Sequence, residues 1–329
     1  MKTIAIVAGG DSSEYDVSLK SAKGVSGFID QNRYHVYTVL IRNGSWTVEL
    51  SDGNRAEIDK NDFSFRVDGQ KIKFDYAYVT IHGRPGEDGR LQGYFDLLDI
   101  PYSSCGVLAG ALTFNKYINN RFLKTQGVRV ADSIRLKKNS QFSILNSQFF
   151  MAEIVRRLGL PVFVKPNGGG SSFGITKVKE AVQVKPAIEK AFAEDDEVIV
   201  EQFVEGREVT CGCYKTKTKQ VVFPVTEIVT QNEFFDYNAK YNGESQELTP
   251  APLPEEITIA IQQETLRIYD LIGAKGFIRV DYIVSADNLP VMLEINTNPG
   301  MTEASIIPQQ IKAAGLDIKD IMTDVIENL

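Results

Sequence analysis

The feature that most constrains this chain is a glycine-rich segment at the end of an apolar run. Residues 160–164 are apolar and predict a strand, and Lys165-Pro-Asn-Gly-Gly-Gly-Ser-Ser-Phe-Gly174 follows directly. Lys165 is therefore expected at a strand end, where glycines and serines can turn backbone N–H groups toward an anion. The segment predicts a loop that cradles phosphate.

A second pair of segments supplies the hard oxygen ligands that this loop lacks. Asp281 and Glu294 flank a predicted β-hairpin, and a turn centred between Asp287 and Asn288 places the two carboxylates directly opposite each other. Asn296 is two residues beyond Glu294, so strand alternation puts both side chains on one face. Such ligands suit magnesium bridging nucleotide phosphates, and the sequence has no His or Cys cluster for zinc. The alternative is a charged hairpin exposed to water.

Composition excludes several classes of protein. The 329 residues are 43% hydrophobic and 24% charged, as expected for a globular chain of two or three domains. The net charge of −7, with no Lys/Arg run longer than a doublet, argues against a nucleic-acid partner. No apolar stretch is long enough to span a bilayer and the N-terminus does not resemble a signal peptide, so we expect a cytoplasmic protein and no membrane partner.

Cys105, Cys211 and Cys213 are expected to be buried thiols without a disulfide, the last two on opposite faces of one strand.

The order of predicted elements indicates an α/β (α+β) chain that begins with an open α/β sheet. Glycine-rich loops at 9–13 and 82–89 follow predicted strands, which is where open α/β sheets bind ligands. Residues 43–72 are polar and turn-rich, and residues 232–251 have the composition of a mobile lid. The predicted strands are residues 4–8, 35–41, 76–81, 160–164, 198–200, 209–214, 221–229, 282–284 and 291–293, and the predicted helices are residues 16–29, 91–98, 112–126, 147–158 and two within 305–329.

Five motifs in one order carry a family resemblance. They are Ala8 to Ser18, Ile81-His-Gly-Arg-Pro-Gly-Glu-Asp-Gly89, Lys165 to Gly174, Phe235-Asp-Tyr-Asn-Ala-Lys-Tyr241, and the paired segments Arg279-Val-Asp281 and Glu294 to Thr302. With these motifs the chain resembles the D-alanine:D-alanine ligases, which are ATP-grasp enzymes, over essentially its whole length.

The resemblance implies three domains: an N-terminal α/β domain at 1–109 with the first D-alanine subsite, a central ATP-grasp domain at 110–200, and a C-terminal domain at 201–329 with a lid at about 231–251. It implies that ATP lies between the antiparallel sheets of the last two. Similar enzymes phosphorylate one D-alanine, and the amine of a second attacks the acyl phosphate to give a peptidoglycan precursor dipeptide. Two Mg²⁺ ions, for which Mn²⁺ can substitute, and a homodimer are also implied.

The resemblance assigns the nucleotide site residue by residue. Lys116 and Lys165 would contact the nucleotide phosphates, and Lys240 in the lid would approach the γ-phosphate. Ser171 and Ser172 of the loop would also bind ATP. The adenosine contacts would be the Glu201 side chain on the adenine amino group, the backbone of Gln202 and Val204 on the ring edge, Phe203 and Phe234 on the ring faces, and Glu208 on the ribose. The alternatives are solvated lysines, core phenylalanines and a surface carboxylate at Glu201.

The remaining assignments concern the reacting groups. Asp281, Glu294 and Asn296 would hold the magnesium ions, with Glu294 bridging them. Arg279 and the backbone N–H of Gly300 would stabilise the tetrahedral oxyanion, although Arg279 could instead pair with Glu294.

The substrate assignments place two alanines. Glu14 would bind the ammonium group of the first D-alanine, and Ser305 the carboxylate of the second. His82 lies near the first subsite, where a hydrogen-bonded structural role is the alternative. Ser171 and Tyr241 would form a hydrogen-bonded set with Glu14, and Tyr241 favours an amine over a hydroxyl nucleophile.

Four competing hypotheses remain to be weighed. The chain could be a D-alanine:D-lactate ligase or another ATP-grasp carboxylate–amine ligase, which would share the nucleotide half. A nucleotide-binding regulatory protein would have lost Arg279 or a metal ligand, and none is lost. A dinucleotide-binding oxidoreductase is disfavoured because the turn at Gly9-Gly10 lacks the spaced third glycine. Small departures from the family pattern occur at 167–170 and at Asn298.

Overall fold

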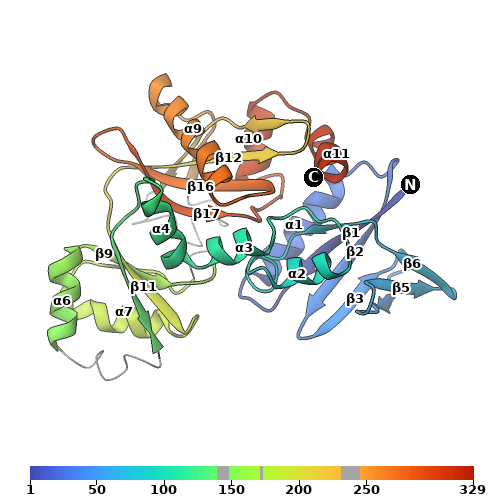
Figure 1. The fold of residues 1–329 in the computed structure, drawn as a ribbon, viewed down its shortest axis with the longest axis horizontal. Coiled ribbons are helices and arrows are strands. Elements are labelled where there is room, and N and C mark those ends of the chain that lie inside the picture. The colour runs from blue at the N-terminus through green and yellow to red at the C-terminus, as the bar shows by residue number, and fades with distance from the viewer. Residues whose placement is uncertain (139–147, 171–172, 231–244) are drawn as a thin grey trace.

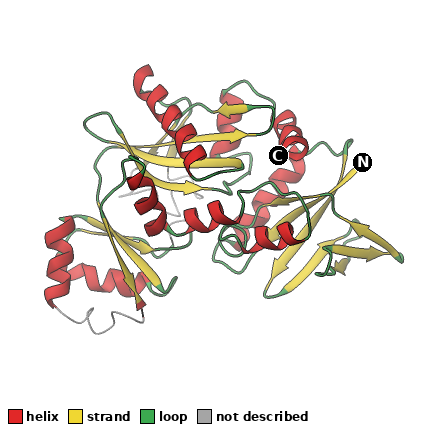
Figure 2. Ribbon diagram, viewed as in Figure 1, coloured by secondary structure: helices red, strands yellow, loops and turns green. Residues whose placement is uncertain are grey.

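The computed structural model describes residues 1–138, 148–170, 173–230 and 245–329. Three main sheets, with helices packed against them, follow one another along the chain, and a two-stranded sheet lies beside the first (Figures 1 and 2). Among the described residues, no helix combines the length and apolarity needed to cross a bilayer.

The first sheet places two loops side by side. Its elements are β1 (Lys2–Gly9), α1 (Tyr15–Phe28), β2 (Tyr34–Arg42), β3 (Ser45–Glu49), β4 (Arg55–Glu57), β7 (Tyr76–Val79) and α2 (Arg90–Leu97), and the separate hairpin is β5 (Ser64–Val67) and β6 (Gln70–Lys73). The strand order is β4-β3-β2-β1-β7, with β1 parallel to both β2 and β7. β1 is apolar and buried from Ile4 to Ala8, as parallel strands covered on both faces require. The loops after β1 and β7 therefore meet at one edge of the sheet, as the sequence predicted.

The second sheet is antiparallel, in the order β10-β9-β11-β8. The elements of this region are α3 (Val107–Phe114), α4 (Lys116–Thr125), β8 (Ser133–Lys137), α6 (Gln148–Leu158), β9 (Val162–Pro166), β10 (Thr176–Val178), the 3₁₀ turn η1 (Ala181–Gln183), α7 (Val184–Ala191) and β11 (Glu197–Gln202).

The single helix predicted at 112–126 is wrong, because the chain forms two helices there. Asn115 has an extended backbone, with φ −90° and ψ 93°, and its side chain accepts a hydrogen bond from the Ile118 N–H at 3.0 Å. Asparagine is a strong N-cap, and it starts a new helix at Lys116. The break puts Lys116 on the first turn of α4 rather than in the middle of a longer helix.

The third sheet is also antiparallel, in the order β15-β14-β12-β16-β17, with β13 paired to β12. Its region contains β12 (Arg207–Lys215), β13 (Gln220–Val222), β14 (Thr226–Thr230), β15 (Ser245–Leu248), α9 (Glu255–Leu271), β16 (Gly276–Val284), β17 (Pro290–Asn296), α10 (Ile306–Ala313) and α11 (Ile318–Asn328). The predicted strand at 221–229 is divided in two around Pro224, which has no N–H for the ladder.

A β-bulge sets the register of the β16–β17 hairpin at its functional end. Near the turn, Tyr282 pairs with Met292, a register that would place Asp281 opposite Leu293 if it continued. The register shifts between Asp281 and Tyr282, so Asp281 pairs with Glu294 as predicted. Because a slip of one residue turns a side chain to the other face of a sheet, the bulge is what brings the two carboxylates together.

The three cysteines are buried and free, as predicted. Burial raises the pKa of Cys105 to about 11 and that of Cys211 to about 12. The expectation that Cys211 and Cys213 face opposite ways is wrong: both belong to one hydrophobic cluster, since residues two apart on a strand share a face.

A pair of glycines on α1 offers a matched test of close packing. A Cβ added to Gly24 would lie 2.1 Å from the Met301 carbonyl oxygen, whereas one added to Gly27 meets nothing within 4 Å. We expect Gly24→Ala to lower the free energy of unfolding by about 1–3 kcal/mol and to reduce any activity that depends on the loop at Gly300. Gly27→Ala should be neutral or raise stability by up to about 1 kcal/mol, because alanine favours helix. Urea unfolding checks both, and equal effects would contradict the packing argument.

Candidate active site

Two adjoining cavities lie where the three sheets face one another. One has a volume of about 280 Å³ and the other about 300 Å³, and both are lined by Glu14, Lys116 and Glu294. Other predicted site residues in the walls are His82, Arg279, Asn296, Gly300 and Ser305 in the first cavity and Lys165 in the second. Residues predicted from distant parts of the sequence therefore line the same two cavities.

Asp281 accepts four hydrogen bonds from three neighbouring side chains. Its Oδ1 accepts from Thr210 Oγ1 at 2.5 Å and from Arg279 Nε at 2.9 Å. Its Oδ2 accepts from Arg279 Nη2 at 2.8 Å and from Asn296 Nδ2 at 3.1 Å. Arg279 forms an ion pair with Asp281, because the planar guanidinium matches a carboxylate two residues along the same strand face. The predicted alternative was an ion pair with Glu294.

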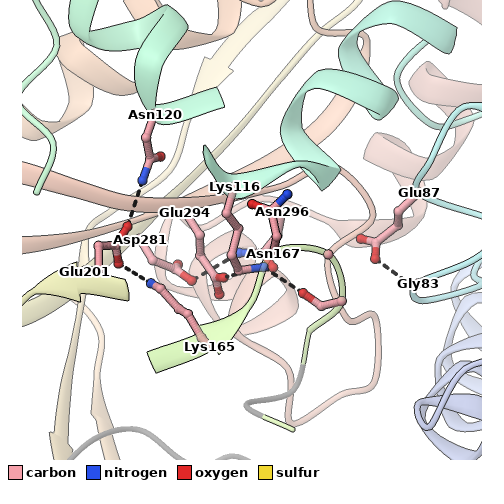
Figure 3. A network of polar contacts seen from close by, with 12 residues as sticks. Gly83, Glu87, Lys116, Asn120, Lys165, Asn167, Glu201, Asp281, Glu294 and Asn296 are labelled. Carbon is pink, nitrogen blue, oxygen red and sulfur yellow. Dashed lines mark hydrogen bonds and ion pairs between the residues drawn. The ribbon is translucent and has the colours of Figure 1, made fainter. Parts of the chain in front are cut away.

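Glu294 faces a lysine from the second sheet's region. Lys116 Nζ lies 3.6 Å from Glu294 Oε2 and donates a hydrogen bond to the Gly169 carbonyl at 2.6 Å. Figure 3 shows Lys116 reaching between Glu294 and the loop. Among described residues, no three His, Cys, Asp or Glu side chains are grouped to hold a metal. The predicted metal site therefore consists of two carboxylates and the Asn296 amide.

Asn167 fixes the glycine loop to α4. Its side-chain oxygen accepts from the Tyr117 N–H at 2.9 Å, and its carbonyl accepts from the Lys116 N–H at 3.1 Å. Its Nδ2 donates to Glu197 at 2.9 Å, and Asp195 accepts from the Gly168 N–H at 2.6 Å. The departure from the family pattern noted here thus gives a loop anchored on both sides.

Lys165 and Glu201 form a buried ion pair (Figure 3). Burial alone would lower the pKa of Lys165, but the Glu201 carboxylate beside it holds that pKa above its usual value. Asn120 Nδ2 donates to the other oxygen of Glu201 at 2.8 Å. The alternative of a surface carboxylate is wrong, since Glu201 is only 3% exposed.

The rest of the predicted adenosine segment runs from the end of β11 through the following loop into β12. Gln202, Phe203 and Val204 line a separate open hollow beside Val128 and Ala131. Lys177 lies over the Phe203 ring at 4.0 Å from its centroid. Glu208 lies on β12, and its charge contributes to the raised pKa of Lys165.

Glu14 and His82 come from the two loops that the first sheet brings together. Glu14 is 6% exposed, and a Cβ added to Gly170 would lie 3.0 Å from its Oε1, so the glycine loop packs on this carboxylate. His82 Nε2 lies 3.1 Å from Ser21 Oγ, in agreement with the structural alternative. Burial lowers the pKa of His82, partly opposed by Glu14, and favours the neutral ring.

Gly300 and Ser305 lie at the other side of the first cavity. A Cβ added to Gly300 would be 3.1 Å from Ser305 Oγ. That hydroxyl accepts from the Thr302 N–H at 3.0 Å and lies at the N-cap of α10. The arrangement keeps the backbone at Gly300 in the cavity wall.

Sequence reasoning missed four polar residues of this region: Asn120, Asn167, Thr210 and Glu87. Asn120 lies one helical turn after Lys116, a spacing that indicates a shared face. Thr210 pairs with Asp281 across β12 and β16, which the sequence alone did not align. Five predicted residues, Ser171, Ser172, Phe234, Lys240 and Tyr241, lie outside the described residues, as does most of the predicted lid.

Glu87 gives a pH-dependent prediction. It lines the first cavity, and its Oε2 accepts from the Gly83 N–H at 2.7 Å. Desolvation, with a contribution from Glu14, raises the pKa of Glu87 from 4.5 to about 8. Its contribution to stability is therefore full below about pH 4.5 and is lost as the pH rises through about 8.

We expect Glu87→Gln, which keeps the acceptor but cannot ionise, to gain stability relative to the parent protein between pH 5 and pH 8. Urea unfolding at several pH values in this interval measures the difference. Glu57→Gln, at an exposed position, should show no such trend. A pH-independent difference for Glu87→Gln would contradict the raised pKa.

Comparison with known proteins gives the same family over the whole chain. The family models described as "D-ala D-ala ligase N-terminus" and "D-ala D-ala ligase C-terminus" match residues 3–105 and 122–327. A D-alanine--D-alanine ligase of Parabacteroides distasonis is 61% identical over 327 residues, covering 99% of this chain and 97% of that protein. One from Bacteroides fragilis is 56% identical, with 99% of each covered.

Comparison with solved structures gives the same family as comparison of sequences. The VanG D-Ala:D-Ser ligase of Enterococcus faecalis superposes with a TM-score of 0.86 at 34% identity, covering 99% of this chain and 98% of that one. A D-alanine--D-alanine ligase of Bacillus anthracis complexed with ATP gives 0.76 at 27% identity, with 99% and 96% covered. With both family models matched and the fold shared end to end, this chain belongs to the D-alanine–D-alanine ligase family and has its ATP-grasp architecture.

Proposed function

We propose that this protein uses ATP to join two D-alanine molecules into D-alanyl-D-alanine, the dipeptide of peptidoglycan precursors. The observation that carries this proposal is the convergence of Glu14, Lys116 and Glu294 on two adjoining cavities. Glu14 can hold the ammonium group of an amino acid, and Lys116 can bind phosphate. Glu294 can bind a metal ion, so the three side chains together suit one reaction. Family membership supports the same reaction.

The chemistry needs activation because a carboxylate is a poor electrophile. Transfer of the γ-phosphate of ATP to the carboxylate of the first D-alanine turns that oxygen into a leaving group. Glu14 holds the ammonium of this alanine, and Lys116 and Lys165 bind the nucleotide phosphates. Ser305 holds the carboxylate of the second alanine, whose amine attacks the acyl phosphate.

Arg279 and the backbone N–H of Gly300 stabilise the oxyanion of the tetrahedral intermediate. Both line the first cavity, and Asp281 holds the Arg279 guanidinium through two hydrogen bonds. Donors fixed in advance need no reorganisation when charge develops. The role of Asp281 toward Arg279 is thus orientation as well as charge balance.

The donor set at the β16–β17 hairpin fits Mg²⁺, because Asp281 and Glu294 are register partners and Asn296 adds an amide oxygen. Two ions, replaceable by Mn²⁺, would offset phosphate charge during transfer.

We further infer three domains with the boundaries expected from the sequence, a cytoplasmic location, a homodimer, and no nucleic-acid or membrane partner.

The direct test is an assay with ATP, Mg²⁺ and D-alanine, alone or with D-lactate or D-serine, followed by phosphate release and product mass. We expect D-alanyl-D-alanine with each mixture. D-serine is included because one similar structure is that of a D-Ala:D-Ser ligase. Preferential formation of a mixed product would overturn the assignment of the second substrate, and ATP binding without phosphate release would overturn the reaction.

A further inference from the structure

A buried asparagine on α4 has no place in the roles described so far. Asn120 is 2% exposed, and its Nδ2 donates to Glu201 Oε1 at 2.8 Å. Its Oδ1 is buried and has no hydrogen-bond partner among the described residues. In Figure 3 its amide nitrogen points to the Glu201 carboxylate, on the side opposite Lys165.

Burial of the Asn120 amide costs free energy, because its oxygen has no hydrogen-bond partner among the described residues. A buried carbonyl oxygen without a donor loses its hydration and regains nothing. An apolar side chain would remove that penalty and still fill the space between α4 and β11. Among the described residues, the one hydrogen bond of the Asn120 side chain goes to Glu201, so this amide acts on its surroundings through that carboxylate.

Asn120 and Lys165 hold Glu201 in different ways. A carboxylate offers about four lone-pair sites, and these two contacts engage one oxygen of Glu201 each. Asn120 is neutral, so it orients the carboxylate without neutralising it. Its side chain is short and fixed to a helix, whereas the long Lys165 side chain can turn toward phosphate. Glu201 then keeps its orientation through Asn120 when Lys165 engages a nucleotide.

We propose that Asn120 is a positioning residue for base recognition, which fixes the Glu201 carboxylate to accept a hydrogen bond from the amino group of a 6-aminopurine nucleotide. The proposal rests on the proposed use of ATP and on the adenine contact that the family resemblance implies for Glu201. A 6-oxopurine presents an oxygen at the same place and is repelled by the carboxylate. Asn120 thus acts on the discrimination between bases through Glu201, without touching the nucleotide.

The neighbouring residue Asn119 provides a matched control. Asn119 is on the same helix, is also 2% exposed, and also has a buried Oδ1 without a hydrogen-bond partner among the described residues. Within the described part of the chain, Asn120 rather than Asn119 hydrogen-bonds to Glu201. Asn119→Ala therefore reproduces the loss of a buried amide without the loss of the Glu201 contact.

The test is calorimetric titration of the full-length protein with ADP and with IDP in the presence of Mg²⁺. We expect the parent protein to prefer ADP by roughly 10- to 100-fold. Asn120→Ala should weaken ADP binding roughly tenfold and IDP binding by less than about twofold, so that the preference falls. Asn119→Ala should leave the preference unchanged.

A second variant separates this role from folding. Asn120→Leu removes the unpaired oxygen together with the donor and fills more of the space than alanine, so it should be at least as stable as Asn120→Ala in urea unfolding and still lose the base preference. Equal weakening of ADP and IDP by Asn120→Ala and Asn120→Leu would overturn the proposal, as would the same loss in Asn119→Ala. Because binding needs no turnover, a protein that discriminates ADP through Asn120 but makes no dipeptide would refute the proposed reaction and leave this inference standing.

Discussion

Asp281→Asn will lower the turnover number by roughly 10³-fold or more while changing the size of the side chain very little. The substitution removes a charge from the predicted metal site and from the carboxylate that orients Arg279. It also leaves the Arg279 guanidinium, whose side chain is only 14% exposed, without its full counter-charge. Steady-state rates of phosphate release, measured well below the melting temperature, give the turnover number.

The same hairpin provides the control. Asp287 lies in the exposed turn of β16–β17 and pairs with Arg129 at the surface, so Asp287→Asn removes an ion pair far from the cavities. It should change turnover by less than about twofold, because surface pairs contribute little. Turnover of Asp281→Asn within tenfold of the parent would show that this carboxylate is not essential for transfer.

Lys165→Met will damage stability and nucleotide binding together. Removing the cation leaves the Glu201 carboxylate buried beside Asn120 alone, which should reduce the free energy of unfolding by about 3–5 kcal/mol. It also removes a charge-assisted contact to phosphate, so ATP binding should weaken roughly 10- to 100-fold. Urea unfolding and calorimetric titration measure the two effects separately.

The double substitution Lys165→Met, Glu201→Gln separates these effects. It removes both members of the buried pair, so most of the lost stability should return. Nucleotide affinity should not return, because the phosphate contact is still missing. Recovery of both properties would mean that Lys165 serves only to neutralise Glu201 and has no part in binding phosphate.

The parts of the molecule that sequence predicted well are those fixed by local pattern. The buried run of β1 followed from apolar patterning. The pairing of Asp281 with Glu294 was predicted from an assumed turn centre, and in the structure it is reached only through a bulge. Of the described residues that the resemblance assigned to the site, most line the two cavities. Local pattern and the order of the motifs were sufficient for the fold class and for the neighbourhood of the site.

What sequence did not predict depends on three-dimensional pairing. The turn is centred at Asp287, which shifts the pairing near it by one residue from the predicted register; the bulge beside Asp281 compensates this shift, and no motif indicates it. The partners of Arg279 and Glu201 depend on which charges face each other once strands and helices have packed, as do the roles of Thr210 and Asn120. Asn115 ended a helix through capping chemistry that apolar periodicity does not record.

The burial of all three cysteines makes this protein suited to thiol-specific probes. Cys105, Cys211 and Cys213 are enclosed and their pKa values are raised, so maleimide reagents should react with them only when the structure opens. A single cysteine introduced on the exposed face of α9 or β3 could then carry a fluorophore without removal of the native thiols. The slow labelling of the native thiols would itself report how often the core opens.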